Sequence, residues 1–183
     1  MTGSTAFTLS YALLWALTLL LSFTTVLLLR DLARRRLVSA DGRKRQGLAA
    51  GSLWSGVEVV TASGATKQLP EPNAAQVILV GAKQCALCRK ALLVLGQVAA
   101  ETGSSLRYLF VYPGTRDELF DHIGDVPSGI TVVYDPANAT RRDLGLVTYP
   151  YAMGIDASGR VRDGMVTHKR EGFDSLISAL GVK

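Results

Sequence analysis

The N-terminal part of the chain is a long run without charge. No Asp, Glu, Lys or Arg occurs from Met1 to Leu29. Within it, the apolar segment Tyr11–Leu29 is about long enough to cross a bilayer core of roughly 30 Å. Basic residues crowd the stretch after it: Arg30, Arg34, Arg35, Arg36, Arg43, Lys44 and Arg45. The sequence therefore predicts a transmembrane anchor over residues 1–30, in contact with membrane lipid.

This run differs from a cleaved secretory signal. Such a signal carries its basic residues in front of the apolar core, the core is shorter, and a small-x-small cleavage site follows. Here the front is uncharged and the back is rich in Arg. We therefore expect an uncleaved, single-pass anchor.

The net positive charge of the chain is explained in part by the basic residues behind the apolar run. The formal net charge is +5, but its basic residues gather behind the apolar run rather than alternating with aromatic residues along a groove. This pattern does not favour a nucleic-acid partner. It predicts a basic juxtamembrane linker over residues 31–55, followed by one domain over residues 56–183.

The domain sequence alternates between strand-like and helix-like segments. Strands are expected at 57–64 and 65–70 (a hairpin), 76–82, 106–112, 129–134, 151–156 and 161–168. Helices are expected at 85–102, 115–123 and 171–180, with a shorter one within 135–146. This order predicts an α/β fold with a mixed central sheet flanked by helices.

Both cysteines lie in the segment "CALC", Cys85 to Cys88, where a buried strand passes into a helix. Unpaired N–H groups and a partial positive charge at a helix N-terminus stabilise a thiolate. Lys83 and Arg89 add positive charge nearby, so we expect both to lower the pKa of a thiol here. The spacing suits a dithiol–disulfide exchanger with Cys85 as the attacking thiol and Cys88 as the resolving one.

Other uses of the two cysteines fit less well. Structural zinc needs four ligands, and His122 and His168 are distant and not spaced as in a zinc finger. A structural disulfide would close a small ring and remove little unfolded-state entropy. Peroxide reduction lacks a nearby hydroxyl, and copper handling would need Met153 or Met165, which core packing explains more simply. We therefore expect no metal and no cofactor other than the Cys85/Cys88 pair, although two buried reduced thiols remain possible.

A proline at the start of an expected strand is the second informative feature. Pro is normally excluded there unless it lies on an edge or in a cis turn. With the "CALC" segment and "TYP", Thr148-Tyr149-Pro150, the chain resembles the thioredoxin superfamily, and its plan is similar to the membrane-anchored bacterial proteins of the methylamine-utilisation and cytochrome-maturation types. The resemblance implies a thioredoxin-like fold and a loop at Thr148, Tyr149 and Pro150 that holds a client strand beside Cys85.

The chain departs from the usual thioredoxin pattern at three places. Gln84 replaces a Trp, Ala86-Leu87 replaces Gly-Pro, and Leu79 stands where a buried acid is common. These departures favour a dedicated client over a general disulfide reductase. Two functions stay open: a membrane-tethered thiol-disulfide oxidoreductase acting on a client protein with cysteines, or a non-catalytic interaction subunit of a larger membrane complex.

Two arguments disagree about the side of the membrane on which the domain lies. The positive-inside rule places the Arg-rich flank, and the domain with it, in the cytoplasm. The resemblance places the domain outside, where a membrane electron donor or complex partner would serve it. We expect the extracytoplasmic side.

Overall fold

The structure, a computed structural model, describes residues 10–27 and 46–181. The chain divides into an N-terminal unit and a folded domain. In the first unit, Ser10–Leu27 forms one helix, and its length and apolar composition suffice to cross a membrane. The expected helix is confirmed over these residues, whereas residues 28–45, which include most of the expected linker, lie outside the described part.

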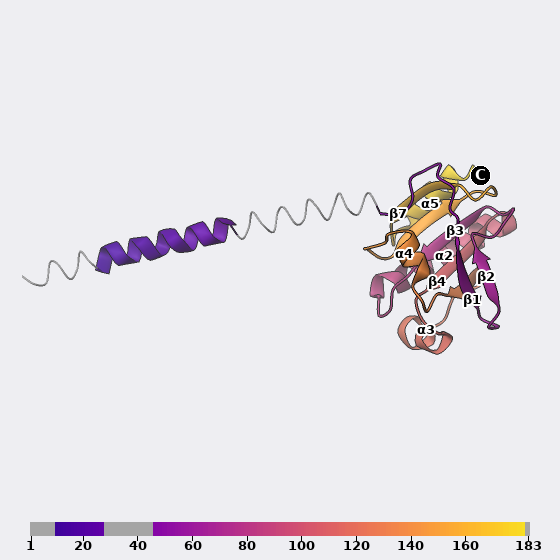
Figure 1. The fold of residues 1–183 in the computed structure, drawn as a ribbon, viewed down its shortest axis with the longest axis horizontal. Coiled ribbons are helices and arrows are strands. Elements are labelled where there is room, and N and C mark those ends of the chain that lie inside the picture. Colours follow the sequence, from indigo (N-terminus) through magenta and orange to yellow (C-terminus); the bar gives the residue numbers. More distant parts are fainter. Residues whose placement is uncertain (1–9, 28–45, 182–183) are drawn as a thin grey trace, which may run out of the picture. The chain divides into compact units, whose positions relative to one another are not determined.

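The domain is built on one mixed sheet of seven strands in the order β2-β1-β5-β4-β3-β6-β7 (Figure 1). The strands are β1 Val57–Thr61, β2 Thr66–Leu69, β3 Gln76–Val80, β4 Arg107–Tyr112, β5 Ile130–Tyr134, β6 Tyr151–Ile155 and β7 Val161–Val166. The central strands β3, β4 and β5 are parallel, while β6 runs antiparallel to β3 with Val80 opposite Tyr151. The expected mixed sheet is confirmed.

Helices surround this sheet. They are α2 Ala86–Thr102, α3 Arg116–Ile123, α4 Ala139–Asp143 and α5 Arg170–Ala179, with a short 3-10 helix, η1, at Gly103–Ser105. The start of α3 carries the expected capping box: Glu118 N donates to Thr115 Oγ1 at 3.4 Å, and Thr115 N donates to Glu118 Oε2 at 3.0 Å. Thr115 therefore begins the helix as its sequence predicts.

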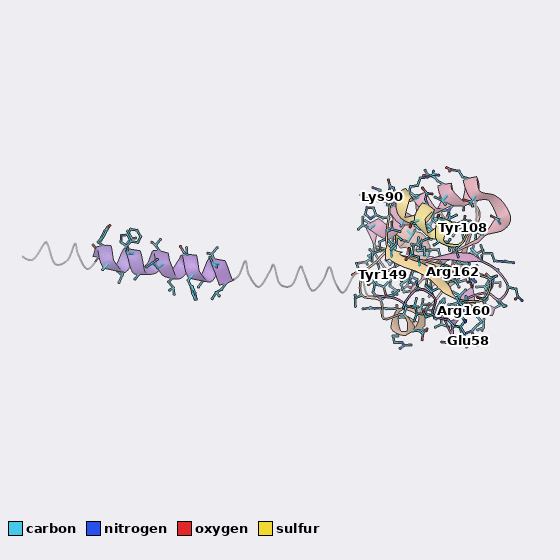
Figure 2. All side chains as sticks on the ribbon, turned by 90° about the horizontal axis from the view of Figure 1, so that it is seen from above. Glu58, Lys90, Tyr108, Tyr149, Arg160 and Arg162 are labelled. Atoms are coloured by element: carbon cyan, nitrogen blue, oxygen red, sulfur yellow. A yellow bond between two sulfur atoms is a disulfide. The ribbon has the colours of Figure 1, made fainter. Side chains whose placement is uncertain are left out.

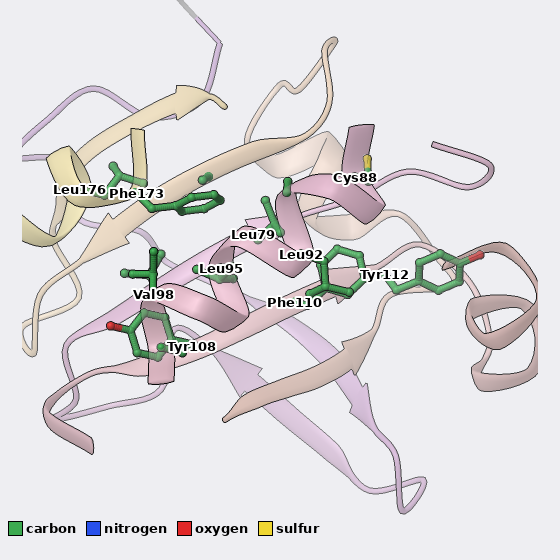
Figure 3. Close-up of a cluster of buried hydrophobic side chains, with 14 of the residues drawn as sticks. Leu79, Cys88, Leu92, Leu95, Val98, Tyr108, Phe110, Tyr112, Phe173 and Leu176 are labelled. Carbon is green, nitrogen blue, oxygen red and sulfur yellow. The ribbon is translucent and has the colours of Figure 1, made fainter. Parts of the chain in front are cut away.

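Alternate residues of the central strands face two separate cores, because side chains in a strand point alternately to opposite faces. In β3, all five residues are buried. Val77 and Leu79 join the core beneath α2, α3 and α5, which Figure 3 shows with Leu92 and Leu95 of α2 and Phe173 of α5. Ile78 and Val80 join the core on the other face. A strand covered on both faces needs the continuous apolar run seen in the sequence.

The segment just before β1 corrects the expected domain boundary. Residues 46–55 were expected to be linker, yet they pack on the domain: Trp54 is buried and its Nε1 donates to Asp143 Oδ2 at 2.6 Å. Arg160, labelled in Figure 2, donates from Nη1 to Gly51 O at 2.9 Å. The folded domain therefore begins before residue 56. The sequence did not show this boundary, because the contacts join residues about 90 or more positions apart and leave no local pattern.

Candidate active site: a disulfide at the start of helix α2

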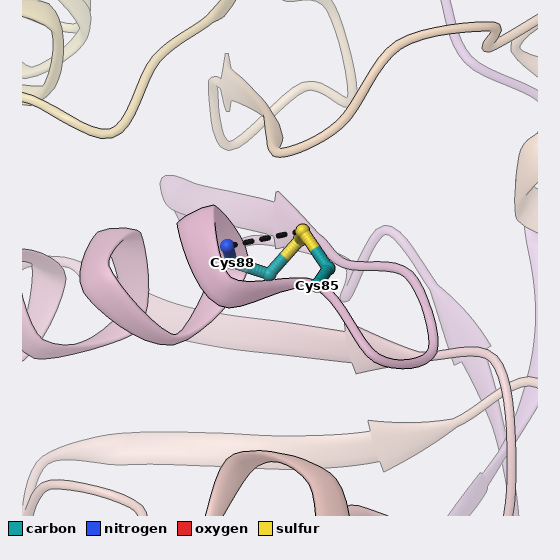
Figure 4. The surroundings of a disulfide bond; sticks show 2 residues. All are labelled: Cys85 and Cys88. Carbon is teal, nitrogen blue, oxygen red and sulfur yellow. Dashed lines mark hydrogen bonds between the residues drawn. A yellow bond between two sulfur atoms is a disulfide. The ribbon is translucent and has the colours of Figure 1, made fainter.

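Cys85 and Cys88 form a disulfide with a Cα–Cα distance of 5.2 Å. Cys85 is the N-cap residue of α2 and has extended backbone dihedrals. Its carbonyl oxygen accepts from Cys88 N at 3.0 Å and from Arg89 N at 3.2 Å. Cys88 N also donates to Cys85 Sγ at 3.1 Å, as Figure 4 shows. The first N–H groups of the helix are thus directed at the end where Cys85 sits.

The turn that leads from β3 to Cys85 is shaped by two residues. Gly81 follows β3 directly, and a Cβ there would lie 2.7 Å from two ring atoms of Phe110. Gln84 has a φ of 51°, in the left-handed region that lets the chain turn tightly before a helix. Close packing on Phe110 and this tight turn place Cys85 just beyond the end of β3, where it packs partly buried against the core beneath α2.

The two sulfur-bearing residues differ in exposure. Cys85 is half-buried, whereas Cys88 is 0% exposed and belongs to the core beneath α2. Figure 3 shows Cys88 among the buried side chains that include Leu79 and Leu92. A partner thiol can therefore approach Cys85 but not Cys88 while α2 stays folded.

The charges around the disulfide are mostly positive or paired. The first turn of α2 contains no acidic residue, so no carboxylate opposes a thiolate at its N-terminus. Lys83 Nζ, however, lies 2.8 Å from Glu118 Oε1, and the hydrogen bond from Lys83 is the main cause that lowers the pKa of Glu118. Arg89 is exposed. Lys83 is thus paired with a carboxylate of α3. That Lys83 and Arg89 lower the pKa of the thiol stays a prediction.

The loop before β6 reaches the same end of the sheet. Because Val80 pairs with Tyr151, the residues that follow β3 lie beside those that precede β6. The Tyr149–Pro150 peptide bond is cis, Thr148 and Tyr149 are half-buried, and Pro150 is buried. Cys85 and Tyr149 pack against the same core. The structure therefore brings the predicted loop and the predicted cysteine pair together.

A cleft of about 210 Å³ opens between this loop and the β3–α2 turn. It is lined by Ala82, Lys83, Pro113, Asn138, Arg141 and Tyr149. Burial raises the pKa of the Tyr149 phenol, with Arg141 lowering it and Asp135 raising it to smaller degrees. The phenol therefore stays neutral at physiological pH. Asn138 and Arg141 were not identified from the sequence as residues of this cleft. They lie at the start of α4 and within it, and a short polar helix gives no sign of which distant cleft it borders.

Leu79, which was expected to stand in place of a buried acid, is fully buried in β3. Within residues 10–27 and 46–181, no three His, Cys, Asp or Glu side chains group as a metal site would require. The chemistry that the described site offers is that of the two sulfur atoms.

The fold and the position of the disulfide define the class of structure: a thioredoxin fold, with the two cysteines at the start of the helix that follows a central parallel strand. No protein-family model and no curated protein sequence matches the chain. Solved structures with this fold do match it, three of them at 18% to 22% identity.

One such structure is a Chlorobium tepidum protein assigned as thiol:disulfide interchange protein DsbE. It is 22% identical, with a TM-score of 0.63 over 73% of this chain and 99% of that one. MTB dsbF, solved in mixed oxidized and reduced forms, is 19% identical, with a TM-score of 0.59 over 68% and 95%. The exposed lipoprotein thioredoxin Etrx1 of Streptococcus pneumoniae is 18% identical, with a TM-score of 0.58 over 69% and 100%. At this level of identity the likeness confirms the thioredoxin-like fold.

Proposed function

We propose that this protein is a membrane-tethered thiol-disulfide oxidoreductase that exchanges its Cys85–Cys88 disulfide with the cysteines of a client protein. The observation that carries the proposal is the unequal exposure of the pair: one sulfur can be reached and its partner is fully buried at the start of a helix. A purely structural disulfide has no need of this arrangement, whereas an exchanger needs one sulfur to meet the client and one to resolve the intermediate.

The exchange runs in two balanced steps. A client thiolate attacks Cys85 Sγ, the Cys85–Cys88 bond breaks, and Cys88 leaves as a thiolate that takes a proton. The second client thiolate then attacks the client sulfur of the mixed disulfide, and Cys85 leaves as a thiolate beside the N-terminus of α2. Two electrons pass from the client dithiol to the pair, and the reverse sequence reduces a client disulfide.

The solved neighbours support this chemistry. One is assigned as a thiol:disulfide interchange protein, and another was solved in oxidized and reduced forms. In this chain, Thr148, Tyr149 and Pro150 would hold the client strand, and Lys83 and Arg89 would favour the thiolate. No cofactor is needed beyond the disulfide itself.

The helix Ser10–Leu27 supports a tether to the membrane, and one of the neighbours is described as an exposed lipoprotein. We place the domain on the extracytoplasmic side, where a membrane electron donor would keep the pair in its working state. Intact cells treated with a reductant and then a membrane-impermeant thiol reagent should add a label to Cys85. Labelling of Cys85 only after lysis would contradict this placement.

The exchange is tested with two matched variants of the full chain. Cys88→Ser leaves the reachable sulfur without its resolving partner, so it should accumulate a mixed disulfide when incubated with a peptide–glutathione mixed disulfide as the probe. Cys85→Ser retains only the buried sulfur and should form little adduct. The wild-type protein, once reduced, should release the probe peptide and recover its own disulfide.

Equal adduct on the two variants would show that burial does not select the attacking sulfur. No reaction of the reduced wild-type protein with the probe would instead favour the second function, an assembly subunit that holds a membrane complex together without catalysis.

A further inference from the structure

Gln46, at the start of the described domain, is bound to a loop about a hundred residues away. Its Oε1 accepts from Thr148 N at 2.9 Å and from Val147 N at 3.2 Å. Its Nε2 donates to Thr148 O at 3.1 Å. Only 8% of Gln46 is exposed. One side chain therefore binds both backbone groups of Thr148, as a neighbouring strand would.

The position of Gln46 is set by the contacts of the residue that follows it. Gly47 N donates to Leu144 O at 3.1 Å. The left-handed φ of Gly47, 81°, and the Tyr151 hydroxyl, which would lie 1.9 Å from a Cβ at this residue, admit only glycine here. Since Tyr151 begins β6, the segment that carries Gln46 is packed against the same strand that the loop enters. The amide group is thus fixed rather than free to leave the loop.

The next residue of the loop, Tyr149, differs from Thr148 in its backbone hydrogen bonds. Within residues 46–181, the backbone N–H and C=O of Tyr149 have no hydrogen-bond partner. Tyr149 directly follows the residue whose backbone Gln46 holds, and it lines the cleft shared with Lys83.

We propose that Gln46 is a positioning residue: it holds the Val147–Thr148 backbone so that the free backbone groups of Tyr149 are presented to an extended client strand beside Cys85. The inference rests on the proposed function and adds a recognition element to it. The partner it implies is a cysteine-containing segment in extended conformation, bound by main-chain hydrogen bonds. Gln46 touches neither the sulfur atoms nor the client.

The first test measures the clamp itself. In Gln46→Met the side chain keeps its length but loses all three hydrogen bonds, so the amides of Val147 and Thr148 should exchange with solvent about fivefold to tenfold faster, as expected for the loss of one net hydrogen bond at each. Gln97→Met, on the exposed face of α2, is the matched control and should leave both amides unchanged. Unchanged exchange in Gln46→Met would overturn the proposal.

The second test separates positioning from thiol chemistry. The reduced protein is mixed either with oxidised glutathione, which is too small to need the loop, or with a disulfide between glutathione and a short extended peptide. Gln46→Met should slow the peptide reaction about fivefold to tenfold and leave the glutathione reaction within about twofold. An equal slowing of both reactions, or of neither, would contradict the role given to Gln46.

Gln46→Glu guards against a variant that fails to fold. It keeps an acceptor for Val147 N and Thr148 N but replaces the donor to Thr148 O, so amide protection should persist while the peptide reaction still slows. Equal peptide rates in Gln46→Glu and wild type would overturn the proposal. If the wild-type protein does not react with the peptide disulfide at all, the proposed function fails, whereas the amide-exchange result still stands or falls on its own.

Discussion

Reduction of the Cys85–Cys88 disulfide should change the stability of the domain by an amount that the structure bounds. The bond closes a ring with a sequence separation of only 3. A ring of this size removes less unfolded-state entropy than a longer loop would, and its contribution is still about 2 kcal/mol in favour of the oxidised form. At about 3 to 4 °C per kcal/mol for a domain of this size, the reduced protein should unfold about 7 °C lower.

An opposing contribution comes from the start of α2. Once the pair is reduced, a thiolate at Cys85 is stabilised by the helix N-terminus by about 0.3 to 1 kcal/mol, and by up to about 2 kcal/mol when partly buried. Because the thiolate is favoured in the folded state, this stability is fully present above the ordinary cysteine pKa of about 8.5 and is lost at lower pH. The gap between the oxidised and reduced forms should therefore be widest near pH 5 and should narrow to about 1 kcal/mol near pH 8.5.

Urea unfolding of the full chain in detergent, oxidised and reduced, at pH 5, 7 and 8.5 measures both contributions. The double variant Cys85→Ser/Cys88→Ser is the control, since reductant should not move its midpoint. A reduced form that is the more stable one at pH 5 would refute the ring argument. A gap that stays constant with pH would refute the stabilisation of the thiolate by α2. The difference between the two forms also sets the preferred direction of exchange.

Two further predictions concern stability. Trp54→Phe removes the indole N–H bond to Asp143 and should lower the free energy of unfolding by about 1 to 2 kcal/mol, while Trp15→Phe in the apolar helix should not change the domain's urea midpoint; equal effects would contradict the packing of the segment before β1. Burial, with the charge of Asp163 adding to it, raises the pKa of Tyr151 to about 12. The folded state therefore keeps a proton that the unfolded chain releases, and between pH 10 and 12 stability should fall by about 1.4 kcal/mol per pH unit on account of Tyr151. In Tyr151→Phe the fall measured by urea unfolding should be shallower by that amount, and an unchanged slope would disprove the assignment.

Most secondary structure was predictable because its causes are local. The continuous apolar run of β3 predicted a strand covered on both faces, and Thr115 with Glu118 predicted the start of α3. Gly103 and Gly124 follow the ends of α2 and α3 with positive φ, where glycine is favoured. Each of these signals lies within a few residues of the structure it predicts.

The early edge of the domain could not be predicted in this way. Gln46 follows directly on the basic stretch and looks like linker, yet it is buried against Thr148. Trp54 gave a partial signal, since a large apolar side chain is unusual in a solvated linker. The residues next to Gln46 and Trp54 in the chain do not predict which distant residue each of them contacts.

The sequence by itself determined the apolar helix, the alternation of strands and helices, and the placement of two cysteines at a strand-to-helix junction, because these depend on the period and spacing of neighbouring residues. The tertiary structure decided which sulfur is exposed, which loop faces it, and that Gln46 holds the loop while the backbone of Tyr149 stays free. These features depend on packing between segments that are distant in the chain, and only the folded sheet brings them within hydrogen-bonding distance.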